Sequence, residues 1–159
     1  MSDRARLSDL KEILDLLYEK LGEFQKALVL RDSDSAKFEL KQRIKREILP
    51  DIRRYEREYW EIFSTETIVI SEDEAVVQLV KVEQAVEFIE RIPNSEYPPE
   101  LLLLLQEIRA KLDDLDRSAS AKLKVSLPLI PMIASYELEM DTEGVMYKTW
   151  KSIARFLGR

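Results

Sequence analysis

The chain has 159 residues, of which 45% are apolar and 35% charged, and a formal net charge of −6, a composition typical of a folded and well-solvated protein. Histidine and cysteine are both absent, which excludes Ser-His-Asp and Cys-His catalysis, disulfides, and metal sites built on imidazole or thiolate. Only 3 glycines occur, which disfavours phosphate-binding loops. We therefore expect a protein that is not an enzyme and that needs no cofactor.

The charge is unevenly distributed along the chain. Residues 1–64 have a net charge of 0, residues 65–118 of −8, and residues 119–159 of +2. An acidic middle segment is not typical of a general nucleic-acid binder, so we expect no nucleic-acid partner. The first ten residues contain arginines but no apolar core of a leader peptide, and no run reaches the ~18 apolar residues of a membrane span. We expect a cytoplasmic location.

Two amphipathic patterns occupy the first 64 residues. Ser8 is a favourable N-cap, and the apolar residues after it recur with the spacing of a heptad: Leu10, Leu14, Leu17, Leu21, Phe24 and Leu28. After a polar turn at 31–35, a second helix kinked at Pro50 carries one apolar side: Leu40, Ile44, Ile48, Ile52, Tyr55, Tyr59 and Ile62. Two long helices joined by a short polar turn predict an antiparallel hairpin. Its remaining apolar surface could support a weak homodimer.

The next two helices follow a β-branched linker at 65–70. Ser71 and Glu74 form an S-x-x-E capping box, and a helix runs from there to about Ile92 with an apolar side: Val76, Leu79, Val80, Val82, Val86 and Ile89. After a loop, Pro98 or Pro99 begins a helix that ends near residue 115. Because the run 101–105 is apolar nearly all round this helix, we expect the helix to be buried on several sides.

The stretch KLKVSLPLIPMIASYELEMDTE, residues 122–143, has a different pattern. Residues 122–127 and 134–140 alternate between apolar and polar, which is the period of a half-buried strand. Pro128 and Pro131 lie between them, where a hairpin would turn. Asp141 then caps a last helix. The sequence thus predicts a mainly α fold: a long antiparallel helical hairpin, residues 1–64, and a compact helical subdomain, residues 65–159, in which 122–140 allows a short β-hairpin.

Three groups of apolar residues are candidates for binding a protein partner. The first lies at the proline-rich tip of the stretch above, the second is an aromatic group in the second helix, and the third belongs to the last helix. Their members are Leu129, Ile130 and Met132; Tyr55, Tyr59 and Trp60; and Trp150. Each group could instead pack into a core, so both interpretations are open.

Three other kinds of site are also weighed. The apolar segment 125–136 and the basic amphipathic last helix could together contact an anionic membrane. The basic second helix could contact nucleic acid, although its interleaved acids are typical of a solvated helix with paired charges. Glu139, Asp141, Glu143 and Gly144 match positions of a calcium loop, but Trp150 stands where that loop needs a bidentate glutamate. We therefore expect no metal.

Residues 121–158, with their apolar-Pro-x-apolar-Pro run followed by S-Y-E-x-E-x-D-T-E, resemble a unit of bacterial effector-associated or adaptor modules. The N-terminal segment LSDLKEILDLLYEKLGEFQKALVLRDS is similar to the helical segments that accompany that unit. The resemblance covers about half the chain and implies a role beside STAND-type NTPases in bacterial signalling or defence, without supplying catalytic residues. We expect a non-enzymatic protein-interaction or adaptor module that can self-associate. A membrane-active effector and a nucleic-acid-contacting regulator are the alternatives.

Overall fold

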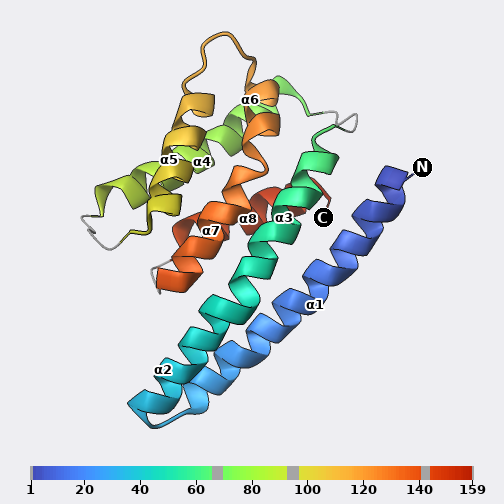
Figure 1. Ribbon diagram of the computed structural model, residues 1–159. Coiled ribbons are helices and arrows are strands. Elements are labelled where there is room, and N and C mark those ends of the chain that lie inside the picture. Colours follow the sequence, from blue (N-terminus) through green and yellow to red (C-terminus); the bar gives the residue numbers. More distant parts are fainter. Residues whose placement is uncertain (1, 66–69, 93–96, 141–143, 159) are drawn as a thin grey trace. The chain divides into compact units, whose positions relative to one another are not determined.

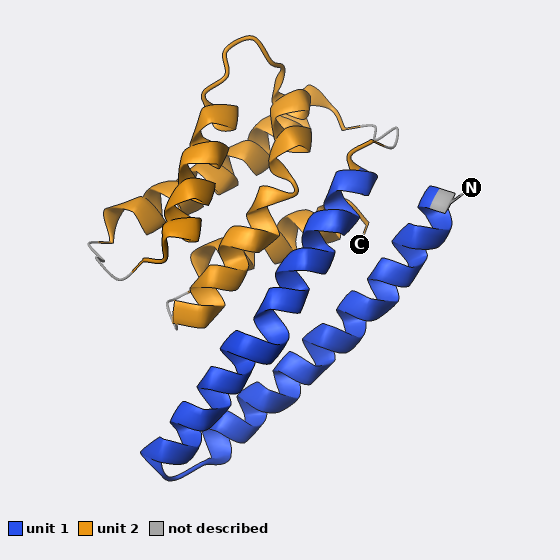
Figure 2. Ribbon diagram, viewed as in Figure 1, with its two compact units in different colours: residues 1–63 blue, residues 64–159 orange. Residues whose placement is uncertain are grey.

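The computed structural model describes residues 2–65, 70–92, 97–140 and 144–158. All secondary structure within these residues is helical and none of them lies in a strand (Figure 1), which confirms the prediction of a mainly α fold. The chain divides into two compact units, residues 1–63 and 64–159 (Figure 2), next to the boundary that the sequence suggested.

The N-terminal unit is a helical hairpin. Helix α1 (Ser2–Leu30) lies antiparallel to a second arm made of α2 (Asp34–Arg43), a π-helical segment (Ile44–Ile48) and α3 (Leu49–Phe63), as Figure 1 shows. Helix α1 begins at Ser2, so Ser8 lies inside it and the predicted N-cap is wrong. Helix α2, after the turn, does have a side-chain cap: the hydroxyl of Ser33 accepts the N–H of Ala36 at 3.1 Å. This bond satisfies one of the unpaired donors that begin α2.

The heptad spacing correctly located the core of this hairpin. Leu10, Leu14 and Leu21 of α1 are buried, because residues spaced by three and four lie on one side of a helix. On the second arm the buried apolar residues are Ile44, Ile48, Leu49, Ile52, Tyr59 and Trp60. The arm continues through Pro50 without a break. The π-helical turn just before Pro50, in which the N–H of Leu49 donates to the carbonyl of Ile44, is the local distortion at this position.

The C-terminal unit contains helices α4 (Glu72–Arg91), α5 (Pro99–Leu112), α6 (Ala119–Ser126), α7 (Leu129–Met140) and α8 (Val145–Phe156). Helix α4 packs against α5, α6 and α8, and α7 packs against α5 and α8. The predicted cap of α4 is confirmed, since the hydroxyl of Ser71 accepts the N–H of Glu74 at 3.2 Å. Pro99 begins α5, as its fixed φ angle favours.

The strands expected within 122–140 do not form. Residues 122–126 belong to α6 and residues 129–140 form α7. Pro128 lies in the turn between them, and Pro131 lies in the first turn of α7, where its missing N–H would have had no helical partner. Buried residues cover most sides of α7, so the apolar run is the centre of this unit. Asp141, the predicted cap of the last helix, lies outside the described residues, and Gly144 precedes α8.

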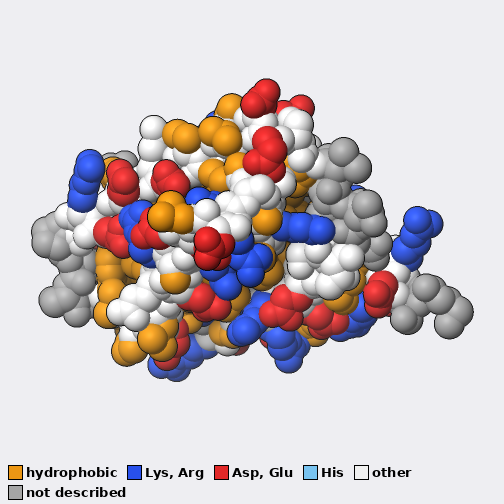
Figure 3. Space-filling view, turned by 90° about the horizontal axis from the view of Figure 1, so that it is seen from above, with side chains coloured by type: hydrophobic (Ala, Val, Ile, Leu, Met, Phe, Trp, Pro, Cys, Tyr) orange, Lys and Arg blue, Asp and Glu red, His pale blue; other side chains and the backbone are white. Residues whose placement is uncertain are grey.

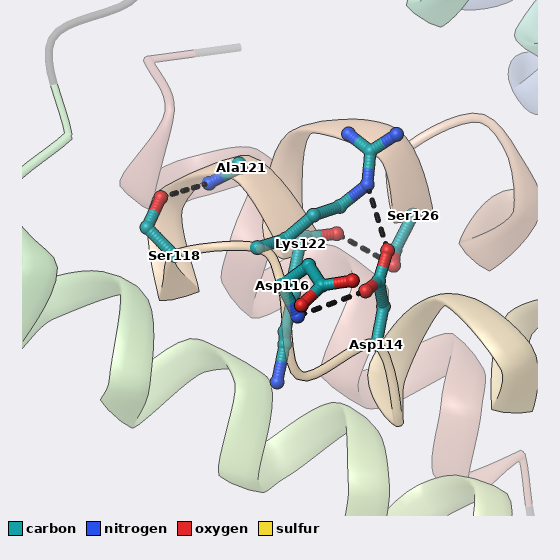
Figure 4. Close-up of polar contacts among 7 residues, drawn as sticks. Asp114, Asp116, Ser118, Ala121, Lys122 and Ser126 are labelled. Carbon is teal, nitrogen blue, oxygen red and sulfur yellow. Dashed lines mark hydrogen bonds and ion pairs between the residues drawn. The ribbon is translucent and has the colours of Figure 1, made fainter.

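The connection between α5 and α6 is fixed by short-range polar contacts (Figure 4). The carboxylate of Asp114 accepts the N–H of Asp116 at 3.0 Å and the Nε–H of Arg117 at 3.1 Å. The hydroxyl of Ser118 then accepts the N–H of Ala121 at 3.3 Å and caps α6. These bonds let the chain reverse direction, because each gives a turn or helix-end donor a partner.

Candidate functional site

The residues predicted to bind a partner lie mostly inside the two units. Five of them are buried and two are half-buried. The buried ones are Leu129, Ile130, Tyr59, Trp60 and Trp150, and the half-buried ones are Tyr55 and Met132. The five buried side chains therefore form core contacts in this structure, which is the alternative that the sequence left open, whereas Tyr55 and Met132 lie partly at the surface.

The aromatic group of α3 forms a stack along the helix. The rings of Tyr59 and Trp60 meet edge to face with centroids 5.0 Å apart, and Trp60 meets Phe63 at 4.9 Å. The guanidinium of Arg54 lies over the ring of Tyr55, 4.5 Å from its centroid. Such contacts stabilise the packing of α3.

The apolar stripe of α8 is also internal. Met146, Trp150 and Ile153 are buried, and α8 packs against α4 and α7. The membrane alternative needs this stripe on a free surface, so in this structure the stripe is not available to a lipid headgroup. No described helix is long and apolar enough to cross a bilayer.

Three basic side chains of the second arm, Arg43, Arg54 and Arg57, pair with acids of the same arm. Arg43 pairs with Glu47 and Arg57 with Glu61, at distances of 3.2 and 2.9 Å and at the i,i+4 spacing seen in the sequence. Figure 3 shows one face of the molecule, on which basic and acidic side chains lie close to one another. A nucleic-acid backbone binds most strongly where basic groups are clustered.

A buried carboxylate joins α7 to α8. Glu137 is only 2% exposed, and its two oxygens accept the N–H groups of Met146 at 3.1 Å and of Tyr147 at 2.8 Å. Burial raises the pKa of Glu137, and the backbone N–H groups at the start of α8 oppose that shift. Glu137 therefore caps α8 from a neighbouring helix, in place of a cap residue next to it. The strand interpretation had placed it on an outward polar face.

Two other carboxylates have similar structural roles. Buried Glu56 accepts the hydroxyl of Tyr18 at 2.6 Å and the indole N–H of Trp60 at 3.1 Å. Glu72 accepts the hydroxyl of Ser120 at 2.6 Å and the N–H groups of Ser120 and Ala119 at 3.1 and 3.0 Å. These bonds lower the pKa of Glu72, with the Ser120 hydroxyl as the largest cause. Each acid thus completes a helix end or a core contact.

Acidic residues form no metal site in the described part of the chain, where no group of three or more is placed to hold an ion. Of the calcium-loop positions, Asp141 and Glu143 lie outside the described residues, and Gly144 has a left-handed φ of 69° just before α8.

Two groups of exposed apolar residues lie on the helices of the C-terminal unit: Val76, Val77 and Val80 on α4, of which the sequence predicts Val76 and Val80 on its apolar side, and Leu102 and Leu103 on α5. The second group lies beside a pocket. Helix α5 is buried on several sides, as the leucine run predicts, but Leu102 is 46% and Leu103 64% exposed. Leu101, Leu104 and Leu105 of the same run are buried. The exposed residues recur at helical spacing along one side of α5, and we name them the α5 outer surface: Pro99, Leu102, Leu103, Gln106 and Ala110.

Helical geometry explains why the run could not be buried completely. Five consecutive residues at about 100° each go once round a helix, so some of them must face away from the neighbours. Helix α5 packs against α4, α6 and α7, and still leaves the side with Leu102 and Leu103 in solvent. The polar residues Gln106 and Glu107 one turn later were the signal in the sequence that this side faces water.

A pocket adjoins the α5 outer surface on the side of α4. Its volume is about 320 Å³, and it is lined by Glu90, Ile92, Tyr97, Leu102, Leu105 and Gln106. The hydroxyl of Tyr97 donates to the carbonyl of Ile89 at 3.1 Å, so the ring is held in place as one wall. A volume near 300 Å³ is at the lower limit for small-molecule sites, and it suits one or two apolar side chains.

Acidic groups border this surface on one edge, and an ion pair borders it on the other. Glu100 and Glu107 lie on α5 beyond Leu103, and both are exposed. On the pocket side, Glu90 of α4 forms an ion pair with Arg109 of α5. The sequence alone does not show this combination of apolar centre and acidic border, because a run of leucines predicts a buried helix.

Comparison of the chain with protein-family models, with curated proteins and with solved structures found no match in any of the three. The resemblance to effector-associated adaptor modules therefore stays a prediction.

Proposed function

We propose that this chain is a non-enzymatic protein-interaction module whose partner site is the α5 outer surface with its adjoining pocket. The observation that carries the proposal is the exposure of Leu102 and Leu103 beside an apolar pocket. Interaction sites of soluble proteins are commonly apolar patches with a polar rim.

The energetic argument concerns what these leucines would gain from a partner. Complete burial of one leucine side chain contributes roughly 1.5–3 kcal/mol, and Leu102 and Leu103 have about half of that area still in water. Single exposed leucines are ordinary, whereas two neighbouring ones next to a concave apolar pocket form a contiguous surface. A partner side chain in the pocket would be surrounded by Ile92, Leu102 and Leu105.

The structural roles of the acids support a role without catalysis. A general acid or base must reach a substrate, and Glu56 and Glu137 are buried and hydrogen-bonded to other parts of the fold. We accordingly expect only background rates with phosphatase, nuclease, esterase and protease substrates. A rate that disappears in Glu137→Gln or Glu139→Gln would contradict the proposal.

A second copy of this chain is the occupant we propose for a separate surface, the hairpin tip. We use that name for Val29, Leu30 and Phe38, which are 83%, 79% and 64% exposed around the turn of the N-terminal unit. Arg31, Asp32 and Asp34 are exposed around them, and Lys37 is half-buried. A two-fold contact needs a self-complementary surface, and these interleaved charges of both signs allow one. The expected result is a weak homodimer.

A partner bound at one surface and a second copy at the other would make the chain an adaptor, as its resemblance to bacterial signalling modules implies. The proposed partner site can be tested by cross-linking in the native cells, with wild type, Leu103→Glu and Leu115→Glu as baits. Leu115 is 93% exposed and lies in the loop after α5, which makes Leu115→Glu a matched control.

We expect a partner that is captured by wild type and by Leu115→Glu and is lost with Leu103→Glu. If the same proteins are recovered with all three baits, the α5 outer surface is not the partner site. Circular dichroism of each bait checks that the helical content is unchanged.

A further inference from the structure

The charges around the α5 outer surface restrict what can bind there. Glu100 and Glu107 lie seven residues apart in the sequence, which is two helical turns, so both border the same edge of the apolar stripe. No ion pair among the described residues includes Glu100 or Glu107, and the ion pair between Arg109 and Glu90 lies on the opposite edge. The segment 65–118 has a net charge of −8, so the longer-range field has the same sign.

The shape of the surface indicates a helical occupant. The stripe from Pro99 to Ala110 follows one side of α5 with spacings of three and four residues, and it is about 16 Å long at 1.5 Å per residue. A second helix of about three turns matches that length, and its own residues at i, i+3 or i+4, and i+7 would alternate with the leucines. The pocket beside Leu102 then takes the largest of these anchors.

On the basis of the interaction surface proposed above, we propose that the α5 outer surface binds an amphipathic α-helix that has apolar anchors and lysine or arginine along its edges. The basic residues would face Glu100 and Glu107 while the anchors cover Leu102 and Leu103. An antiparallel two-fold contact with a second copy of the same surface would bring these unpaired glutamates together. An anionic lipid surface would be repelled by the same groups.

Two synthetic helical peptides of about four turns provide the test. Both carry the same leucine stripe, and they differ only in having lysine or glutamate at the edges. Fluorescence anisotropy of each labelled peptide is measured against the full chain as wild type, Leu103→Glu, Leu103→Gln and Leu115→Glu. Because Leu103 is exposed, the fold should tolerate these changes, and thermal melting checks this for each variant.

We expect the lysine peptide to bind wild type at least about tenfold more tightly than the glutamate peptide, and to lose affinity as ionic strength rises to about 1 M. Leu103→Glu and Leu103→Gln should each weaken binding by about tenfold, whereas Leu115→Glu should change it by less than about twofold. The effect of Leu103→Glu is informative because the added acid would by itself attract a basic peptide.

Two results would overturn this inference in different ways. If both peptides bind equally and both are lost with Leu103→Gln, the surface is a partner site but its preference for a basic helix is wrong. If the lysine peptide does not bind, or binds all four proteins equally, an amphipathic basic helix is not its occupant. In either case the cross-linking comparison still decides whether the α5 outer surface binds any protein.

Discussion

A carboxylate oxygen of Glu137 in α7 lies 3.1 Å from the backbone nitrogen of Met146 in the first turn of α8. Its other oxygen accepts the next N–H along the helix, that of Tyr147, at 2.8 Å. The last helix of the C-terminal unit is thus anchored through its N-terminal donors to a buried side chain, in addition to the apolar contacts of Met146, Trp150 and Ile153.

Replacing Glu137 by glutamine should destabilise the C-terminal unit. The amide can accept one of the two N–H groups, but its own NH₂ group would face the other, leaving buried donors unsatisfied. Such a defect costs about 1–3 kcal/mol of unfolding free energy. Denaturant unfolding of wild type and Glu137→Gln measures this, with exposed Glu107→Gln as a control that should change stability by less than about 0.5 kcal/mol. Equal midpoints for Glu137→Gln and wild type would contradict the role of this cap.

The unfolding free energies of wild type and Glu137→Gln should depend differently on pH. Burial is the largest influence on Glu137 and raises its pKa above the ordinary value. A group with a raised pKa binds more protons in the folded than in the unfolded protein, so its contribution to stability declines as pH rises through the folded pKa. The unfolding free energy of wild type relative to Glu137→Gln should therefore rise as the pH falls from neutral toward the ordinary glutamate pKa. If the difference in unfolding free energy stays constant or falls as the pH is lowered, the pKa of Glu137 is not raised in the folded protein.

Leu127 tests the placement of the proline-rich run in the core. It is completely buried in the turn between α6 and α7, so Leu127→Ala should lower the unfolding free energy by about 2–5 kcal/mol. Leu115→Ala removes the same atoms from a side chain in solvent and should have almost no effect. Ile130→Asp should unfold the C-terminal unit, because Ile130 is fully buried and a charge there would have no compensating partner. A well-folded Ile130→Asp protein would return this residue to the list of partner contacts.

The hairpin was predictable because its helices are long and each has one periodic apolar side. Leu10, Leu14 and Leu21 are buried as the heptad spacing requires. The run 122–140 was not predictable in the same way, because α6 and α7 have 8 and 12 residues and each is covered by several neighbours. A short helix buried on many sides has no clear period of 3.6, and local alternation then imitates a strand.

The candidate site was missed for a related reason. A run of leucines indicates that part of a helix is buried. Which of the leucines are covered depends on helices from other parts of the sequence, and these helices do not cover Leu102 and Leu103. Conversely, Ile130, Trp60 and Trp150 are of the residue types found at partner-binding sites, but they lie in the interior. Glu137 could not be identified as a cap, since its partners are nine and ten residues away and no motif for an N-cap has that spacing.

Glu72 should control the first turn of α6. Its carboxylate binds the N–H groups of Ala119 and Ser120, which have no helical partners of their own. In Glu72→Ala, hydrogen exchange at these two amides should become faster, while Asp73→Ala, a change of the neighbouring exposed acid, should leave it unchanged. Because the pKa of Glu72 is lowered, the protection should be present at neutral pH and decline as the pH falls through that lowered pKa. Unchanged exchange in Glu72→Ala would contradict the contact.

The hairpin tip predicts a concentration-dependent dimer. Leu30→Glu should make the protein monomeric over the concentration range in which wild type associates, because it places like charges together across a two-fold contact. Leu16→Glu changes another exposed leucine of α1, about 21 Å along the helix from Leu30, and should leave association unchanged. Sedimentation equilibrium at several concentrations measures both. If the wild-type protein stays monomeric at high concentration, the prediction of a homodimer is wrong.

The most direct test of the partner site on α5 is a map of where a bound helix lies. Nuclear magnetic resonance spectra of the full chain can be recorded during titration with the lysine-edged peptide. Binding at the α5 outer surface predicts the largest shift changes at Leu102, Leu103, Leu105 and the ring of Tyr97, with little change at Val29, Leu30 and Phe38 of the hairpin tip. Shift changes that are centred on the hairpin tip, or that are absent from α5 at saturation, would contradict the account.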